Sequence, residues 1–422
     1  MTVKPELPLA GIVVADFSRV LAGPLCTQLL ADAGARVIKI EEPRRGDETR
    51  RWGPPFVSGV SAYFLSINRN KESVAIDLRS ARGIAVARRL VAMADVVVDN
   101  FLPAQRRALL PDIPARAVHC TITGFDRDTP QRDTPGYDLL AQAESGMMSI
   151  TGEPDGDPMK SGVAVADILT AHYACGAIAA ALVRRERSGR GARIEVSLFD
   201  AALASLVNVA QSVLLTGREA KRFGNAHPSI VPYGVFHAAD RPFALGVGTD
   251  RHFQLLCTDV LRRPALAADA RFSTNAARVR HRAALTRMLA REFRTQRAAA
   301  WVARCRRASV PASLVRGVRE ALRTAAGRAM TGELEHPVLG RYGAVCNPLR
   351  IDGARLGIGT PPPALGQQTG TILREIEGGR YAESRSRNAQ QRRTKASRTI
   401  TRSAARNSRP PAASGAKARK AK

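Results

Sequence analysis

The chain has 422 residues and is 45% hydrophobic, so it can bury more than one core, and two domains are expected. It contains no apolar run of about 18 uncharged residues and no N-terminal apolar segment typical of a secretory signal, so neither a membrane span nor secretion is predicted. Six dispersed cysteines without a CxxC pair, and seven scattered histidines, predict reduced thiols in a cytoplasmic protein and no metal site.

The formal net charge of +28 would suit a nucleic-acid-binding protein, but much of the charge is concentrated at one end of the chain. Residues 381–422 contain 13 lysines and arginines, one acidic residue (Glu383) and almost no groups that could form a core. We therefore predict a disordered basic tail over residues 380–422, which supports only nonspecific contacts with nucleic acid or other anions. The remaining excess is arginine spread over predicted helix surfaces.

The first part of the chain alternates between predicted strands and predicted helices. Buried strands are predicted at residues 12–17, 35–41, 73–77, 95–99 and 117–122, and helices at residues 24–33 and 81–93. This alternation predicts an α/β fold with a large Rossmann-like parallel sheet flanked by helices. The G-x-G-x-x-G turn of dinucleotide-binding folds is absent, because residues 19–24 read RVLAGP, so NAD binding is excluded.

A helix at residues 168–187, a strand at 192–197 and a helix at 198–215 complete this first part. From residue 224 a loop rich in glycine, proline and histidine and a hairpin at 234–248 precede several amphipathic helices. Strands resume near residue 336, and a last helix is predicted at 369–377. We therefore expect a large domain, residues 1–215 with a return at 331–379, and a smaller inserted α+β domain at 224–330.

Asp167 interrupts the nearly unbroken apolar run of residues 162–183. A buried carboxylate is costly unless it is hydrogen-bonded or paired. As a helix N-cap, Asp167 would accept hydrogen bonds from free backbone N–H groups at the start of the predicted helix. As a nucleophile, it would be kept ionised in a dry pocket by the same N–H groups and by the helix dipole. The residues alone leave both interpretations open and favour the cap.

Eight ordered stretches resemble the class III CoA-transferases, the CaiB/BaiF group whose best-known type is formyl-CoA transferase. They are LAGIVVADFSRVLAGP (9–24), GARVIKIEE (34–42), NRNKESVAIDL (68–78), ADVVVDNF (94–101), PGYDLLAQA (135–143), the helix of Asp167, GNAHP (224–228) and PPPALG (361–366). Together they cover roughly residues 8–376 in the family's order. The resemblance implies a large α/β domain built from both chain ends, a smaller inserted domain, and a homodimer of two interlocked ring-shaped protomers.

The resemblance also implies a reaction. Asp167 aligns with the family's nucleophilic aspartate, which favours the nucleophile over the cap. Its carboxylate would attack an acyl-CoA thioester to give an aspartyl anhydride, then an aspartyl-CoA thioester, before CoA passes to a carboxylic acid acceptor. Acyl-CoA and a carboxylic acid are thus the implied substrates, with no permanently bound cofactor and no metal. The loop at 224–233 resembles members that handle short dicarboxylates, so succinyl-CoA is the expected donor.

The family's contacts with CoA fall, by position, on seven residues of this chain: Leu21, Ala22, Ile76, Arg79, Asn100, Phe101 and Tyr137. Arg79 would pair with CoA phosphates, and Phe101 would line the path of the adenine or the pantetheine. The alternatives are core packing for Leu21, Ala22 and Ile76, a turn after a strand for Asn100, and a solvated charge for Arg79. Backbone N–H groups of glycines near 224 and 246–248 are the expected oxyanion donors.

Two other functions remain as alternatives. The α-methylacyl-CoA racemases of the same family move a proton with a histidine and an aspartate, and their histidine lies in a Gly-His-Asp segment. This chain has Tyr137 between Gly136 and Asp138, and tyrosine is a poor base at neutral pH. A non-catalytic basic binding protein is the alternative of a different class, and only the net charge favours it.

Overall fold

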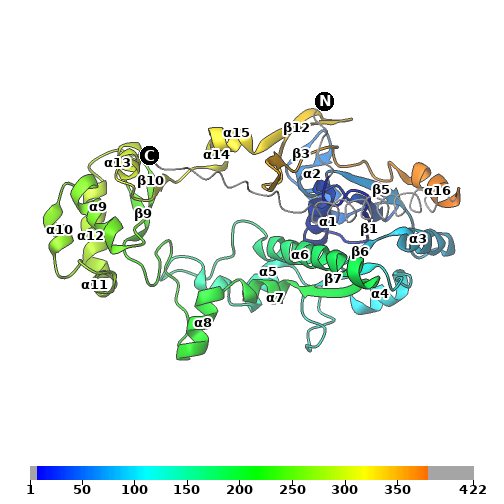
Figure 1. The fold of residues 1–422 in the computed structure, drawn as a ribbon, viewed down its shortest axis with the longest axis horizontal. Coiled ribbons are helices and arrows are strands. Elements are labelled where there is room, and N and C mark those ends of the chain that lie inside the picture. Colours follow the sequence, from blue (N-terminus) through cyan, green and yellow to red (C-terminus); the bar gives the residue numbers. More distant parts are fainter. Residues whose placement is uncertain (1–6, 379–422) are drawn as a thin grey trace, which may run out of the picture.

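The computed structural model describes residues 7–378. The predicted basic tail of residues 380–422 lies outside the described residues. Figure 1 shows two lobes joined by two separate stretches of chain. One connection is residues 217–232, and the other contains helices α14 (Val318–Leu322) and α15 (Ala325–Ala329).

The first lobe is built on a six-stranded parallel sheet, as the alternation of strands and helices predicts. Its strands are β1 (Val13–Asp16), β2 (Arg36–Glu41), β5 (Lys71–Ala75), β6 (Val96–Asp99), β7 (Val118–Thr123) and β8 (Ala192–Ser197). They lie in the order β5-β2-β1-β6-β7-β8, and every neighbouring pair is parallel. The chain therefore winds outward from β1 in one direction and then from β6 in the other, as in a doubly wound fold.

Helices cover both faces of this sheet (Figure 1). The helices of the lobe are α1 (Ala22–Asp32), α2 (Ala62–Ile67), α3 (Ala81–Met93), α4 (Pro103–Leu109), α5 (Asp138–Glu144), α6 (Val165–Ser188), α7 (Leu198–Ala204), α8 (Val207–Thr216) and α16 (Thr369–Glu377). Helices α1 and α6 share one hydrophobic core with the sheet, and α3 and α16 share another on the opposite face. Because α16 packs against β5 and α3, residues from both ends of the chain build this lobe. The lobe also contains the 3-10 turns Glu48–Arg51 and Met148–Ile150 and the short strands β3 (Phe56–Val57) and β4 (Val60–Ser61).

Helix α6 is the long apolar helix that contains Asp167. It packs against α1 and α7 and along β7 and β8, with Ala171, Ala174 and Ile178 fully buried. By length and composition alone α6 would also qualify as a membrane span, although no such span is expected from the sequence. Core helices of α/β proteins meet the same criteria, and the contacts of α6 place it beside α1 against the sheet.

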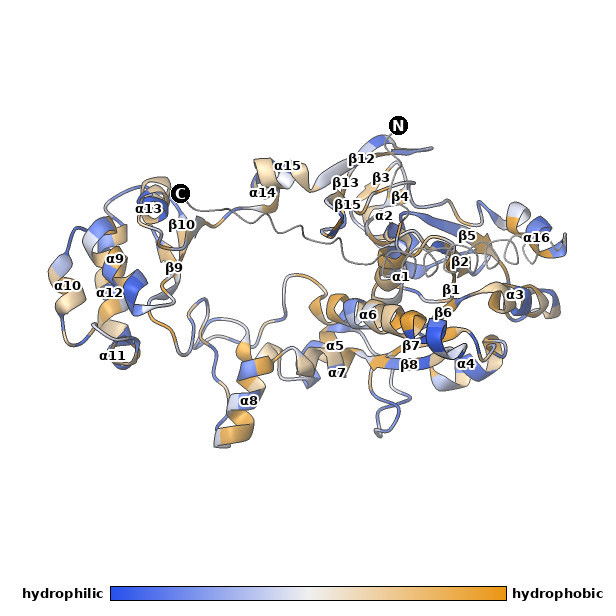
Figure 2. Ribbon diagram, in the orientation of Figure 1, coloured by the Kyte–Doolittle hydropathy of each residue, from blue (hydrophilic) through white to orange (hydrophobic). Residues whose placement is uncertain are grey.

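The prediction of one helix at residues 198–215 is wrong. The chain forms α7 and α8 instead, and the two helices are bent by 76°. The hydroxyl of Ser205 donates to the carbonyl of Ala202, and Val207 has a φ of 40°, which a regular helix does not allow. Helix α8 projects from the lobe with Val207, Leu214 and Leu215 at least 70% exposed, and Figure 2 shows its apolar colouring.

The second lobe contains the predicted hairpin and the predicted amphipathic helices. Its strands are β9 (Tyr233–His237), β10 (Pro242–Gly246) and β11 (Ala312–Leu314), and its helices are α9 (Asp250–Leu255), a π-helical turn (Leu256–Val260), α10 (Pro264–Ala268), α11 (Asn275–Arg280), α12 (Arg282–Phe293) and α13 (Ala298–Arg307). Phe293 lies at the centre of its core, in edge contact with Phe236, Phe243 and Trp301. Two hairpins, β12 (Thr331–His336) with β13 (Gly340–Val345) and β14 (Arg350–Ile351) with β15 (Ala354–Arg355), precede α16.

Candidate active site

The strand order creates a natural binding position. Strands β1 and β6 are neighbours, but the chain leaves them toward opposite halves of the sheet. Ligands of such sheets bind outside the carboxyl ends of the strands at this switch point. Here the segments that follow β1 (residues 17–22) and β6 (residues 100–102) line two adjacent cavities. Four residues line both cavities: Arg19, Glu48, Phe101 and Gln105.

The smaller cavity has a volume of about 260 Å³ and contains Asp167 in its wall. Asp167 lies in the first turn of α6 and is 9% exposed. Opposite it begins α1, whose first residue, Ala22, donates its backbone N–H to the Asp167 carboxylate. A helix N-terminus carries a partial positive charge, so α1 favours negative charge at this position.

Asp167 is not the N-cap of α6, so the cap interpretation is wrong. Ala164 occupies the N-cap position and makes no side-chain cap hydrogen bond. The free N–H groups of the first turn are satisfied from another helix instead: Oδ1 of Asp138 accepts from the N–H of Ala166 at 2.8 Å and from that of Asp167 at 3.4 Å. Because Asp138 caps the helix, the carboxylate of Asp167 is available to the cavity.

The surroundings of Asp167 raise the pKa of its carboxyl group. Burial, followed by the neighbouring carboxylate of Asp138, raises the pKa of Asp167 to about 7, and the hydrogen bond from Ala22 acts in the opposite direction. Tyr63 on α2 faces the same charges: burial and then the negative charge of Asp167 raise the pKa of Tyr63 to about 12. A carboxylate poised near neutral pH in a cavity is typical of reactive groups.

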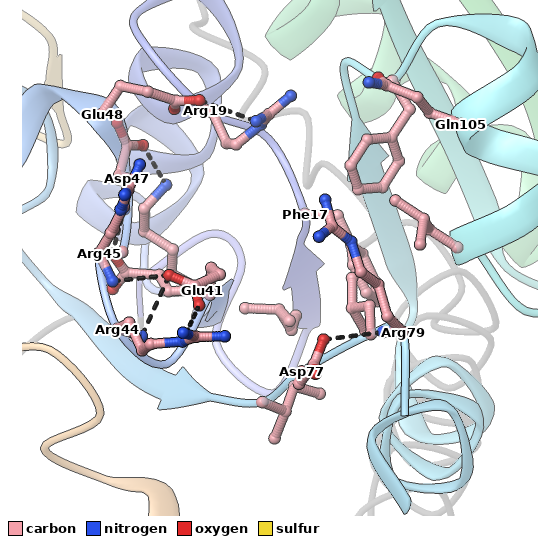
Figure 3. Close-up of a pocket in the computed structure, with 18 of the residues that line it drawn as sticks. Phe17, Arg19, Glu41, Arg44, Arg45, Asp47, Glu48, Asp77, Arg79 and Gln105 are labelled. Carbon is pink, nitrogen blue, oxygen red and sulfur yellow. Dashed lines mark hydrogen bonds and ion pairs between the residues drawn. The ribbon is translucent and has the colours of Figure 1, made fainter. Parts of the chain in front are cut away.

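The larger cavity has a volume of about 560 Å³ and is rich in arginine. Figure 3 shows Arg44, from the loop after β2, and Arg79, from the loop after β5, on opposite sides of this pocket. Arg45 and Arg51 also line it, together with acidic residues such as Glu41 and Asp77. Several guanidinium groups around one open pocket suit a ligand with more than one phosphate group.

All seven residues expected to contact CoA line these two cavities. Leu21, Ala22, Asn100 and Tyr137 line the smaller one, Ile76 and Arg79 the larger one, and Phe101 both. Ala22, Ile76 and Phe101 are buried, Leu21 and Asn100 are half-buried, and Arg79 and Tyr137 are exposed. Asn100 has a structural task as well, because its side-chain amide accepts from the N–H of Arg19 at 3.0 Å and donates to the carbonyl of Arg19 at 2.9 Å.

Two glycines bring distant parts of the chain together at the smaller cavity. A Cβ atom added to Gly124 would lie 2.5 Å from the Cα of Gly136, and one added to Gly136 would lie 2.1 Å from the Cα of Gly124. Only glycine permits this close approach of backbones, which places Tyr137 at the end of β7. By contrast, glycines 224, 246 and 248 do not line the cavity that contains Asp167 within this chain, whereas Ala22 already donates to Asp167.

Sequence reasoning missed three residues of the site. Asp138 caps α6, Tyr63 has its pKa raised by burial and then by the charge of Asp167, and Glu48 holds Arg19 through a 2.8 Å ion pair between the two cavities. Asp138 stood in a matching stretch, directly after Tyr137, and a pairing of its carboxylate with the start of α6 could have been considered. Tyr63 and Glu48 lie in segments with no such signal. Among residues 7–378, no group of three or more His, Cys, Asp or Glu residues is arranged to hold a metal ion.

Known proteins share both the sequence and the fold. The model of CoA-transferase family III matches residues 9–369. Succinate–glutarate CoA-transferase of Agrobacterium fabrum is 40% identical over 88% of this chain and 96% of its own length. Succinyl-CoA:glutarate CoA-transferase of Mus musculus is 38% identical over 87% of this chain and 86% of its own length. A crystal structure of a CaiB/BaiF family protein from Brucella suis is 38% identical, has a TM-score of 0.78, and covers 88% of this chain and all of its own. The chain therefore belongs to CoA-transferase family III.

Proposed function

We propose that this CoA-transferase moves CoA from succinyl-CoA, or a similar short dicarboxylic thioester, to a carboxylic acid, with Asp167 as the nucleophile. One observation carries the proposal: Asp167 lines a cavity from a helix that Asp138 caps, and it accepts a hydrogen bond from the first N–H of α1. The substrate class is supported by the relatives from A. fabrum and M. musculus, which are named for succinate or succinyl-CoA and glutarate.

The proposed reaction passes CoA through Asp167 to the acceptor and releases the donor acyl group as its free carboxylate, without hydrolysis of either thioester. A carboxylate oxygen of Asp167 attacks the thioester carbonyl, the carbon–sulfur bond breaks, and CoA leaves as a thiolate. The thiolate attacks the side-chain carbonyl of Asp167, which gives an aspartyl-CoA thioester and the free donor carboxylate. The acceptor carboxylate attacks this aspartyl-CoA thioester, which gives an acceptor–aspartyl anhydride and releases the CoA thiolate. The thiolate then attacks the acceptor carbonyl of the anhydride, which forms the acceptor CoA thioester and regenerates the Asp167 carboxylate. The buried position of Asp167 limits the access of water to the anhydride.

The N–H of Ala22 is the proposed oxyanion donor. It already donates to the carboxylate of Asp167, so it lies within reach of negative charge that develops on the oxygen of the aspartyl carbonyl. The partial positive charge at the N-terminus of α1 acts in the same direction. This assignment replaces the glycines at 224 and 246–248 within a single chain.

We further propose that the two adjacent cavities hold one CoA molecule. The thioester end would lie beside Asp167, between Leu21, Tyr137 and Asn100, and the phosphates would lie among Arg44, Arg79 and their neighbours in the larger cavity. Phe101 lines both cavities, as expected for a residue along the connecting pantetheine. These positions match the order in which a thioester, a pantetheine and a nucleotide follow one another in CoA.

The proposed assembly is a homodimer of interlocked protomers. It is supported by the two lobes with their two separate connections, and by the apolar side chains of α8, which residues 7–378 leave exposed (Figures 1 and 2). The lobes would correspond to the large domain and to the inserted domain at residues 224–330. A cytoplasmic location is supported by the six cysteines, which are all free thiols.

Chemical trapping tests the proposed nucleophile. Purified protein incubated with succinyl-CoA and then with hydroxylamine should carry an aspartyl hydroxamate at position 167, detected by peptide mass spectrometry. Asp138→Asn, which leaves the nucleophile in place, should still be labelled at Asp167. A hydroxamate on another residue, with none at Asp167, would refute the proposal. Racemase activity has no observation in its favour, since no histidine lines the part of the smaller cavity that the structure describes.

A further inference from the structure

The loop between β1 and α1 is held by side chains from three neighbouring segments. Between Ser18 and Val20, five backbone groups find side-chain partners. Asp16 accepts from the N–H of Ser18 at 3.0 Å, and Nζ of Lys39 donates to the carbonyl of Ser18 at 2.8 Å. Asn100 binds the N–H and the carbonyl of Arg19, and Asp47 accepts from the N–H of Val20 at 3.4 Å. We call Asp16, Lys39, Asp47 and Asn100 the 18–20 clamp.

The clamp is buried and charged. Lys39 and Asp47 form an ion pair at 2.8 Å, and both side chains are inaccessible to solvent. Asp16 pairs in turn with Lys71 at 3.2 Å, and those two side chains are also inaccessible. Burial opposes the charge on Asp47, but the adjacent ammonium group of Lys39 lowers the pKa of Asp47 overall, so both partners stay charged. Buried ion pairs contribute little net stability, and the best-attested reason for keeping them is a specific geometry.

The clamped loop ends in an unfavourable backbone conformation. Val20 has a φ of 71°, in the left-handed region that a β-branched residue rarely adopts. Two residues later, Ala22 donates its N–H to Asp167. Close packing fixes the same turn from the other side, because a Cβ atom added to Gly23 would lie 2.2 Å from the Cβ of Ser18. Strain of this kind persists only where the surroundings enforce it.

We propose that the 18–20 clamp forces Val20 into its left-handed conformation, and that this conformation directs the N–H of Ala22 onto Asp167. Val20, Asp47 and Lys39 are thus positioning residues, which act on the reaction through Ala22. The inference rests on the proposed role of Asp167. Glycine adopts positive φ at no steric cost. The inference therefore predicts that a chain with glycine at position 20 would not need the 18–20 clamp.

Asp47→Asn weakens the clamp by removing the charge that pairs with Lys39. Without the clamp, Val20 should relax to negative φ and withdraw the N–H of Ala22 from Asp167. We expect kcat for CoA exchange to fall by about 10-fold with little change in KM, as for lost transition-state contacts. The acid limb of the pH–rate profile should also move upward by about half a pH unit, because a hydrogen bond that favours the carboxylate is lost.

The direction of this pH shift separates positioning from simple electrostatics. The groups that act on Asp167 are the N–H of Ala22 and the carboxyl of Asp138 on α5, the charge of Asp167 acts in turn on Tyr63 of α2, and Tyr137 and the paired Arg19 and Glu48 line the same cavity. Removing the negative charge of Asp47 would, by charge alone, lower the pKa of Asp167. An upward shift therefore reports the loss of the hydrogen bond.

Glycine at position 20 provides the decisive comparison. Asp47→Asn combined with Val20→Gly should recover at least about 3-fold of the lost kcat and return the acid limb toward its wild-type position, since glycine needs no clamp to adopt positive φ. Asp47→Asn combined with Val20→Ala should recover neither. Ser309→Gly is the matched control: Ser309 has a φ of 55° in the second lobe, so its replacement should not rescue Asp47→Asn. If Asp47→Asn does not fold, Lys39→Gln takes its place, because Lys39 donates to the carbonyl of Ser18, and it is combined in turn with Val20→Gly, Val20→Ala and Ser309→Gly.

The outcomes distinguish this inference from the proposed function. Absence of any rescue by Val20→Gly, with Asp167→Asn inactive, would overturn the positioning role and leave the nucleophile intact. Equal rescue by Val20→Gly and Ser309→Gly would also overturn it, because the effect would then be one of stability. Undiminished transfer by Asp167→Asn would overturn both the nucleophile and this inference.

Discussion

Replacing Asp167 by asparagine should make the protein more stable while it abolishes transfer. Burial and the charge of Asp138 raise the pKa of Asp167 from 3.8 to about 7, so the folded protein holds this proton more tightly than the unfolded chain does. Between about pH 4 and 7 the unfolded chain loses this proton while the folded protein keeps it, so the free energy of unfolding falls as the pH rises, and above pH 7 the loss is complete. An amide of the same shape is never ionised, and it can still accept the hydrogen bond from Ala22.

The size of the effect follows from the pKa difference. A difference of about 3 pH units corresponds to about 4 kcal/mol at pH values above 7, at 1.36 kcal/mol per unit. For the 372 described residues, this free energy corresponds to a rise in Tm of roughly 3 to 6 °C. Near pH 4 the carboxyl of Asp167 is protonated in the folded state, and the advantage of asparagine should disappear. A residue that merely capped α6 would give the opposite result, because losing a cap lowers stability.

Thermal melts of wild type and Asp167→Asn at several pH values between 4 and 8, with CoA exchange measured by mass spectrometry, test this reasoning. The difference in Tm between Asp167→Asn and the wild type should increase as the pH rises. Transfer by Asp167→Asn should be lower than that by the wild type by orders of magnitude. Asp200→Asn is the control, because Asp200 lies in the first turn of α7 but is exposed, so its gap should stay small at every pH. A melting temperature of Asp167→Asn at or below that of the wild type at pH 8 would refute the electrostatic argument.

Three further predictions concern the neighbours of Asp167, the larger cavity and the tail. The acid limb of kcat/KM should have an apparent pKa near 7. Asp138→Asn can still cap α6 but carries no charge, so in a pH–rate series it should move that limb to lower pH. An acid limb that does not move would contradict the role of Asp138. Arg79→Ala should raise KM for the acyl-CoA by about 10-fold and change KM for the acceptor little, as expected for one lost phosphate contact. Arg88 is an exposed arginine of α3 outside both cavities, so Arg88→Ala should change neither KM. Deletion of residues 381–422 should leave CoA exchange intact and remove most of the salt-sensitive binding to nucleic acid in a titration; equal binding without the tail would assign that binding to the two lobes.

The sheet could be predicted from the sequence because its strands are short apolar runs between helical segments. The bounds of α3, α16 and β8 agree with the predicted ranges, since capping or glycine signals fix their ends. The break between α7 and α8 could not be predicted in this way. It depends on a positive φ at Val207, and residues 198–215 read as one continuous apolar helix.

The candidate site likewise contains some residues that could be located from the sequence and others that could not. Phe101 and Arg79 could be located through the family resemblance, and both follow strands of the parallel sheet and line the larger cavity. Tyr63 and Glu48 could not, since their positions depend on how the segment between β2 and β5 folds back over the sheet. No local pattern in that segment indicates which side chains face the cavity.

The cap interpretation of Asp167, which the residues alone favoured, shows what a local pattern cannot decide. An aspartate before a helical run predicts an N-cap wherever the helix must satisfy its own first N–H groups. In this fold another helix satisfies them, through Asp138, and α6 begins two residues before Asp167. The carboxylate then stands inside the first turn, with no structural partner in its own helix. The separation of the two tasks between Asp138 and Asp167 is what allows one carboxylate to stabilise the helix and the other to remain free to react.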